Sequence, residues 1–148
     1  ALASTVLLGV GNAQAALLID NFLDFQKVES NGPLTNSQVG PTGNILGGYR
    51  DLFVEVVNNS STNPTNPFLS SEFSVFSGEA SFNNDAYVTG AGRIRWDGNN
   101  DSGTLNPLGL GGIDITGGSL LDSLFMDVIF ADLGLNMTFT IYDKTNTA

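Results

Sequence analysis

The sequence predicts an all-β domain, an antiparallel β-sandwich or jelly roll with about seven or eight short strands. Two observations favour this fold class. After residue 15, apolar side chains mostly alternate with polar ones at a period of two, and helical periodicity is hard to find. Clusters of Gly, Asn and Pro separate these segments, as turns separate short antiparallel strands. Because each such strand buries one face, two packed sheets are expected.

The first half of this domain is expected to contain two strands and a long loop. Residues 17–22 form an apolar opening strand. Residues 51–56 alternate clearly, with Asp51 and Glu55 on the solvent face. Residues 58–67 contain two prolines and no aliphatic side chain, which predicts an exposed connection.

Three further strands are expected in the middle of the chain. Residues 73–76 and 87–96 alternate, and Gly90 and Gly92 interrupt the second of these segments. Residues 113–115 form a shorter apolar segment. In the second strand, side chains two residues apart share a face, so its two arginines are expected on the side opposite its Ile and Trp.

The last expected element is a hairpin. Residues 133–142 show the clearest alternation in the chain, with five apolar side chains on one face. Residues 124–130 also alternate, although their outer face is partly apolar, as in a central strand. Residues 131–134 supply Asp and Gly for a tight turn between them.

The composition excludes several function classes. The 148 residues include 5 Lys or Arg and 15 Asp or Glu, giving a formal net charge of −10, and no His or Cys. Without imidazole or thiol there is no Ser-His-Asp triad, Cys nucleophile, His-ligated zinc or disulfide. Five scattered basic residues cannot form the cationic stripe that nucleic acids require. Carboxylate chemistry and the binding of hard metals remain.

The first 15 residues predict export. They carry no charge, and an apolar run over residues 2–10 is followed by the small-residue triplet Ala13-Gln14-Ala15. This pattern predicts the end of a secretory signal peptide, because the run is too short to span a bilayer and the triplet fits a signal peptidase. We therefore expect residues 1–15 to be a leader remnant and residues 16–148 to form one all-β domain beginning at Ala16.

Several short motifs occur in a characteristic order. They are Ile19-Asp20-Asn21-Phe22, Gly47-Gly48-Tyr49-Arg50-Asp51, Trp96-Asp97-Gly98 and Gly109-Leu110-Gly111-Gly112-Ile113-Asp114. With the leader and the closing hairpin, this order resembles exported bacterial proteins, common in cyanobacteria, that carry a PEP-CTERM sorting tail. The resemblance implies a protein exported to the cell surface or extracellular matrix. It also implies extracellular polysaccharide or other surface proteins as partners, and no established enzymatic activity.

The defining tail of that family is a Pro-Glu-Pro step, an apolar helix and a basic cluster. The sequence ends at Ala148 without them and begins without Met. We therefore expect a fragment that is truncated at its C-terminus. Membrane anchoring is expected only through the tail that this sequence lacks.

The segment after Trp96 is the candidate metal site. Asp97, Asn99 and Asp101 place oxygen-bearing side chains at alternate positions, as the first half of a calcium loop does. Leu108 stands where such a loop has its bidentate Glu. The same residues form turns in their own right, so a hairpin loop without cofactor is the alternative to calcium.

Carbohydrate binding is the main alternative to a purely structural role. Lectin-like sandwiches stack sugars on exposed aromatic rings and hold hydroxyls with polar side chains. The ligand-binding candidates are Trp96, Arg93 and Arg95, with the further aromatic candidates Tyr49, Tyr87 and Tyr142. A core position for Trp96 is the other possibility, because it shares a face with Ile94. No local motif selects a catalytic carboxylate pair, so we expect no enzyme.

Overall fold

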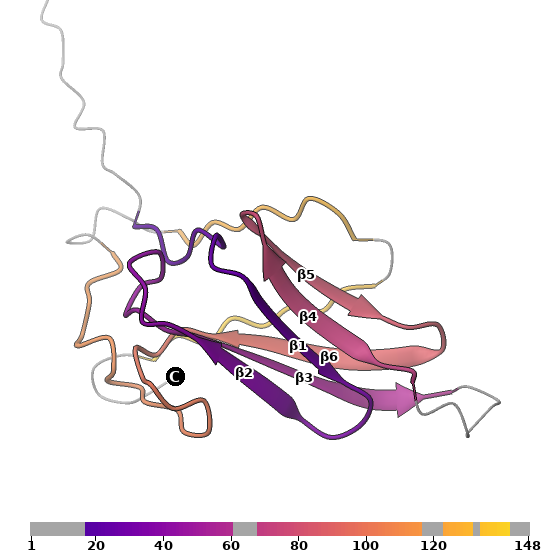
Figure 1. The fold of residues 1–148 in the computed structure, drawn as a ribbon. Coiled ribbons are helices and arrows are strands. Elements are labelled where there is room, and N and C mark those ends of the chain that lie inside the picture. The colour runs from indigo at the N-terminus through magenta and orange to yellow at the C-terminus, as the bar shows by residue number, and fades with distance from the viewer. Residues whose placement is uncertain (1–16, 61–67, 117–122, 132–133, 143–148) are drawn as a thin grey trace, which may run out of the picture.

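The chain forms two antiparallel sheets and no helix in the residues that the computed structural model describes, which are 17–60, 68–116, 123–131 and 134–142. The strands are β1 (Gln26–Ser30), β2 (Thr35–Val39), β3 (Arg50–Asn59), β4 (Ser71–Phe76), β5 (Glu79–Asn84) and β6 (Val88–Arg95). One sheet has the order β1-β4-β5 and the other β2-β3-β6 (Figure 1). The all-β prediction is therefore confirmed. These residues contain six strands, whereas seven or eight were expected for the whole chain.

The two sheets share one small hydrophobic core. It consists of the buried side chains of β1, β3 and β4, with Phe22, Phe82 and Ile94 packed around them. The buried members are Val28, Leu52, Val54, Phe73 and Val75. Because these side chains come from both sheets, the two sheets contribute to one core in a sandwich-like arrangement.

Three connections join strands of different sheets, since β1 leads to β2, β3 leads to β4 and β5 leads to β6. Residues 31–34 form the first of them and residues 85–87 the third. All three start at the end of the molecule where β1, β3 and β5 end, and we call this end the loop end. The opposite end, where β3 begins and β6 ends, is called the motif end (Figure 1).

Three predicted strands are confirmed, as parts of β3, β4 and β6. Gly90 and Gly92 do not interrupt the last of these, because both lie inside β6. A Cβ at Gly92 would lie 2.9 Å from ring atoms of Phe73 and Phe82. Glycine here allows the strand to approach the opposite sheet closely.

Two predicted strands are wrong. Residues 17–22 contain only an isolated bridge between Asp20 and Ile45. The Asp20 carboxylate accepts a hydrogen bond from the backbone N–H of Phe22, whose φ is 56°. Residues 113–115 form no strand either, because the Asp114 carboxylate accepts a hydrogen bond from the N–H of Thr116. Side chains that bond to their own backbone two residues on favour turns over sheet pairing.

The predicted C-terminal hairpin is not formed in the described residues. Residues 123–131 and 134–142 run past the sheets as extended chain without strand pairing (Figure 1). Their large aliphatic and Phe side chains are 44–86% exposed. Residues 132–133, within the expected turn, lie outside the described residues. Alternation assigns a face to each side chain, but a strand also needs a neighbour for its N–H and C=O groups.

Three strands were missed because they are polar. β1 has the alternating burial of a strand, but two of its three buried residues are Gln26 and Ser30. Both are satisfied, since Gln26 bonds to Arg50 and the Ser30 hydroxyl donates to the carbonyl of Pro33 at 2.6 Å. β2 and β5 each contain few apolar residues. Hydropathy alone could not identify these strands.

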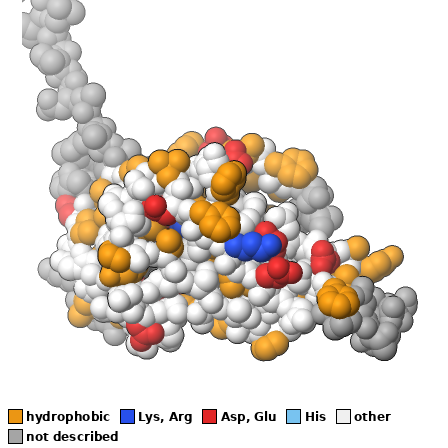
Figure 2. All heavy atoms as spheres, viewed as in Figure 1, with side chains coloured by type: hydrophobic (Ala, Val, Ile, Leu, Met, Phe, Trp, Pro, Cys, Tyr) orange, Lys and Arg blue, Asp and Glu red, His pale blue; other side chains and the backbone are white. Residues whose placement is uncertain are grey.

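The surface carries little positive charge. Figure 2 shows one small basic area on the face in view, with acidic side chains beside it and at several other points. Within the described part of the chain, no helix has the length and apolar character needed to cross a membrane.

Candidate functional site

A buried arginine organises the motif end. Arg50 is completely buried and bonds to both oxygens of the Asp20 carboxylate, at 3.1 and 3.0 Å from Nη1. Its Nε donates to Oε1 of Gln26 at 2.8 Å, and its Nη2 donates to the carbonyl of Asp24 at 2.5 Å. A buried guanidinium is tolerated only when its charge and its N–H groups are matched in this way.

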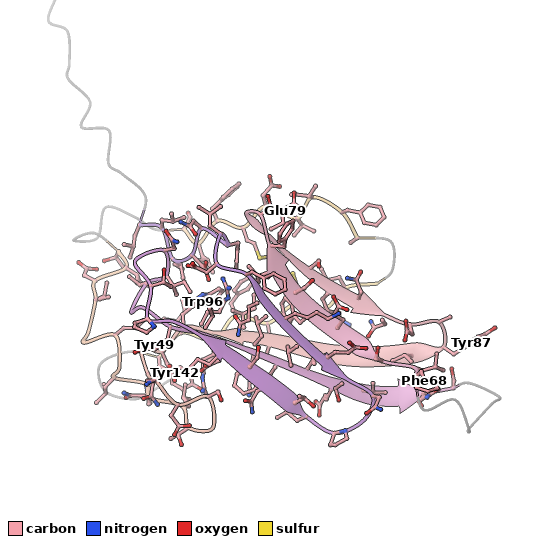
Figure 3. All side chains as sticks on the ribbon, viewed as in Figure 1. Tyr49, Phe68, Glu79, Tyr87, Trp96 and Tyr142 are labelled. Atoms are coloured by element: carbon pink, nitrogen blue, oxygen red, sulfur yellow. The ribbon has the colours of Figure 1, made fainter. Side chains whose placement is uncertain are left out.

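Trp96 belongs to the same cluster. Its indole Nε1 donates to Oδ2 of Asp20 at 2.8 Å, and the residue is half-buried. Figure 3 shows Trp96 and Tyr49 at the motif end, away from Tyr87 at the loop end. The indole of the predicted sugar-stacking residue is thus a partner of the Asp20–Arg50 ion pair.

Glycines bring the remaining motifs to this end. A Cβ at Gly47 would lie 2.9 Å from the Cα of Gly98, and one at Gly98 would lie 2.6 Å from the carbonyl oxygen of Gly109. Both Gly47 and Gly98 have positive φ, 77° and 65°. The four motifs that carry the family resemblance therefore meet at one end of the sandwich, through Asp20, Arg50, Trp96 and these close glycine contacts.

Arg95 forms a second cluster on the outer face of the β2-β3-β6 sheet. Its Nη2 and Nε donate to Oδ2 of Asp51 at 2.6 and 2.9 Å, and its Nε lies 3.2 Å from Oδ2 of Asp97. Nη2 also donates to the carbonyl of Ser102 at 2.8 Å. Asp51 is buried, so its predicted solvent-facing position is wrong. The neighbouring strand places a guanidinium over it, which hydropathy could not show.

The candidate calcium residues are engaged with their own loop. Asp97 accepts the backbone N–H of Asn99 on Oδ1 and that of Asn106 on Oδ2, besides its ion pair with Arg95. The carboxylate of Asp101 accepts the N–H of Gly103 at 2.8 Å. A cation and two N–H donors thus contact the Asp97 oxygens, and the calcium site stays a prediction.

The amide nitrogen of Asn99, the third predicted ligand, lies 3.3 Å from the carbonyl of Thr104, to which it donates. No group of three or more acidic side chains suited to a metal occurs among the residues that the structure describes.

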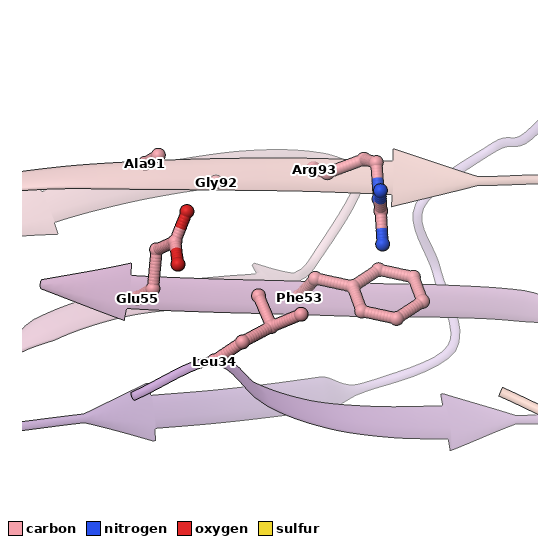
Figure 4. A pocket seen from close by; sticks show the side chains of 6 residues that line it. All are labelled: Leu34, Phe53, Glu55, Ala91, Gly92 and Arg93. Carbon is pink, nitrogen blue, oxygen red and sulfur yellow. The ribbon is translucent and has the colours of Figure 1, made fainter. Parts of the chain in front are cut away.

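Among the predicted ligand-binding residues, Arg93 borders a hollow. Its Cζ lies 4.0 Å from the centroid of the Phe53 ring, and the structure gives it no ion pair with another described residue. The hollow has a volume of about 130 Å³ and is lined by Leu34, Phe53, Glu55, Ala91, Gly92 and Arg93 (Figure 4). The ring of Phe53 is only 3% exposed, because Arg93 and Arg95 cover it, so it offers no stacking face.

The loop end contains a larger hollow. It measures about 330 Å³ and is lined by Glu29, Asn31, Phe68 and Ser70. The hydroxyl of Ser70 donates to Oε1 of Glu29 at 2.8 Å and lies 3.3 Å from Oδ2 of Asp85. The backbone N–H of Ser70 also donates to Oδ2 of Asp85, at 2.8 Å. Ser70 thereby holds carboxylates from two separate strand ends beside the hollow.

Comparison of the chain with protein-family models, curated proteins and solved structures gave no match.

Sequence reasoning missed Asp20, Arg50 and the loop-end residues as a set. Their separation along the chain is too large for any local motif, since Asp20 and Trp96 are 76 positions apart. The one available signal was an arginine, Arg50, in a short motif directly before an alternating strand. Its position does not indicate which acidic residue pairs with it.

Proposed function

We propose that this chain is a domain of an exported protein of the cell surface or extracellular matrix, with a structural or adhesive role and no catalysis. One observation carries the proposal most. Polar and charged residues of three of the motifs bond to one another at the motif end, where Arg50 bonds to Asp20 and Asp20 accepts a hydrogen bond from the indole N–H of Trp96. Their chemistry is directed to holding the sandwich together.

Features of the sequence support the proposed localisation. The apolar leader that ends at Ala15 is typical of export, and the motif order resembles that of PEP-CTERM sorting proteins. Residues 1–15 lie outside the described residues. In this proposal the net charge of −10 keeps the exported domain soluble and repels polyanions. Anchoring would come from a sorting tail encoded beyond Ala148.

A jelly-roll-like topology is part of the proposal. The three connections that pass from one sheet to the other, β1 to β2, β3 to β4 and β5 to β6, support it. Sheet-crossing connections are typical of Greek-key sandwiches, whereas a simple meander stays within one sheet.

Cell fractionation tests the proposed address. The tagged product of the full gene should appear in the surface or extracellular fraction, and mass spectrometry should find a mature N-terminus at Ala16. As control, an Ala13→Asp/Ala15→Asp variant should leave the leader uncleaved, because a signal peptidase requires small side chains there. Recovery of the wild-type product in the cytoplasm with its leader intact would overturn the proposal.

A further inference from the structure

We propose that the loop end binds a neutral saccharide, with the ring of Phe68 against a sugar face and the polar groups of Glu29, Asn31 and Asp85 on its hydroxyls. The inference extends the adhesive role proposed above and rests on it. It places the binding surface away from Trp96, Arg93 and Arg95.

Two exposed aromatic residues mark this end. Phe68 is 81% exposed and Tyr87 is 71% exposed, and Figure 3 shows both at the loop end. Tyr87 has a φ of 70°, a left-handed conformation that is uncommon for a bulky residue. The backbone carbonyl of Tyr87 accepts the N–H of Ser60 at 2.9 Å, which ties this turn to the end of β3. Such rings present a flat apolar face to the C–H groups of a pyranose.

The polar groups beside Phe68 are held in place as acceptors. Ser70 donates its hydroxyl to Glu29 and its backbone N–H to Asp85, and the N–H of Asp85 donates in return to the carbonyl of Ser70 at 2.9 Å. Ionised carboxylates only accept hydrogen bonds, and sugar hydroxyls are donors that match them. The Asn31 amide adds a group that can both donate and accept.

The size of the hollow fits part of an oligosaccharide. Its volume of about 330 Å³ falls in the range of roughly 300–1,000 Å³ that is common for small-molecule sites. It is more than twice as large as the hollow beside Arg93, whose aromatic ring is covered. Loops at the end of a sandwich are also where binding residues commonly lie on a rigid scaffold.

The local charge selects against acidic glycans. Glu29, Asp85 and Glu72 are acidic, and the ammonium of Lys27 lies 2.7 Å from the carboxylate of Glu72 and 3.6 Å from that of Glu29. The hydrogen bond to Glu72, with smaller contributions from Glu29, raises the pKa of Lys27 above its ordinary value of 10.5, so these two acids share one cation and the local charge stays negative. A uronate or sulfate would meet two carboxylates at this end, and like charges in contact oppose binding. We therefore infer a ligand with hydroxyl groups and no charge.

Titration of the purified chain with oligosaccharides tests the site. The probes are cellohexaose, maltohexaose and mannohexaose as neutral sugars and an alginate hexamer as the acidic one, followed by isothermal titration and saturation-transfer NMR. At least one neutral hexamer should bind saturably with a Kd in the millimolar range, a binding free energy of about −4 kcal/mol. In the NMR experiment, saturation should pass from the aromatic rings of Phe68 and Tyr87 to the sugar. The alginate hexamer should bind at least tenfold more weakly.

Phe68→Ala should weaken that binding by roughly tenfold, the equivalent of about 1.4 kcal/mol. The matched control is Phe76→Ala, which removes a similarly exposed ring, 70% exposed, from the other end of β4 and should leave the affinity unchanged. Glu29→Gln, which keeps the side-chain shape, should weaken binding severalfold. Thermal melting checks that each variant is folded.

Three results would overturn the inference: no neutral hexamer binds at ten millimolar, Phe68→Ala and Phe76→Ala have equal affinities, or alginate binds best. None of these results bears on the proposed export, because cell fractionation measures localisation and not ligand binding. Conversely, a cytoplasmic product that still bound cellohexaose would overturn the proposed localisation but support the saccharide site.

Discussion

Two segments of the chain have the same sequence pattern and different structures. β4 and residues 134–142 both alternate apolar with polar side chains, and residues 134–142 do so over a longer run. In β4, Phe73 and Val75 are buried, whereas Leu135 and Met137 in the other segment are about half exposed. β4 lies between β1 and β5, which bond to it on both sides. Alternation predicts a face, and neighbouring strands decide whether that face is buried.

The buried charge at the motif end should give the largest effect. Arg50→Met leaves the Asp20 carboxylate buried without its cation, so we expect a loss of about 3–5 kcal/mol in the free energy of unfolding. Urea denaturation followed by circular dichroism measures it. Arg93→Met, at an exposed arginine over Phe53, is the control and should cost less than about 1 kcal/mol. Equal losses in the two variants would contradict the assignment of Arg50 as the organising charge.

A matched pair of leucines compares the two regions directly. Leu52→Ala removes a fully buried side chain from the core and should cost about 2–5 kcal/mol. Leu135→Ala removes the same atoms from a half-exposed position and should change stability by less than about 1 kcal/mol. The difference between the two urea midpoints is the quantity to measure. A Leu135→Ala loss as large as that of Leu52→Ala would mean that residues 134–142 pack as a core strand in solution.

A matched pair of glycines makes the same comparison for the backbone. Gly98→Ala places a Cβ 2.6 Å from the carbonyl oxygen of Gly109 at a φ of 65°, so we expect a loss of about 1–3 kcal/mol. Gly134→Ala meets no atom within 4 Å and should be neutral within about 1 kcal/mol, since it also restricts the unfolded chain. Thermal melting separates these outcomes, and a destabilising Gly134→Ala would reveal contacts in that segment.

The fold class and three strands could be predicted because their information is local. Leu52, Val54 and Val75 lie two residues apart from other apolar side chains on one face of their strands, and that pattern suffices to place them in a core. β1 could not be found in this way, since Gln26 is buried only because Arg50 lies opposite it. Burial of a polar side chain depends on a partner 24 positions away, and a single sequence does not show which residue that is.

In the candidate site, too, local features could be predicted from the sequence and contacts between distant residues could not. The spacing of Asp97, Asn99 and Asp101 correctly indicated a loop rich in side-chain oxygens, and those oxygens do bond within it. The spacing could not show that Arg95 reaches Asp97, because the guanidinium is positioned by Asp51 on the neighbouring strand β3. The loop-end residues come from three connections, which only the crossing of the chain between the sheets brings together.

The smallest expected effect is that of calcium on this loop. Because Arg95 and two backbone N–H groups already occupy the Asp97 carboxylate, 5 mM calcium should raise the melting temperature by less than about 1 °C. Calcium and magnesium screen the net charge of −10 equally, so magnesium at the same concentration is the control for screening. A calcium-specific rise of several degrees that disappears in Asp97→Ala/Asp101→Ala would show that the loop rearranges to release Arg95, and would confirm the calcium site predicted from the sequence.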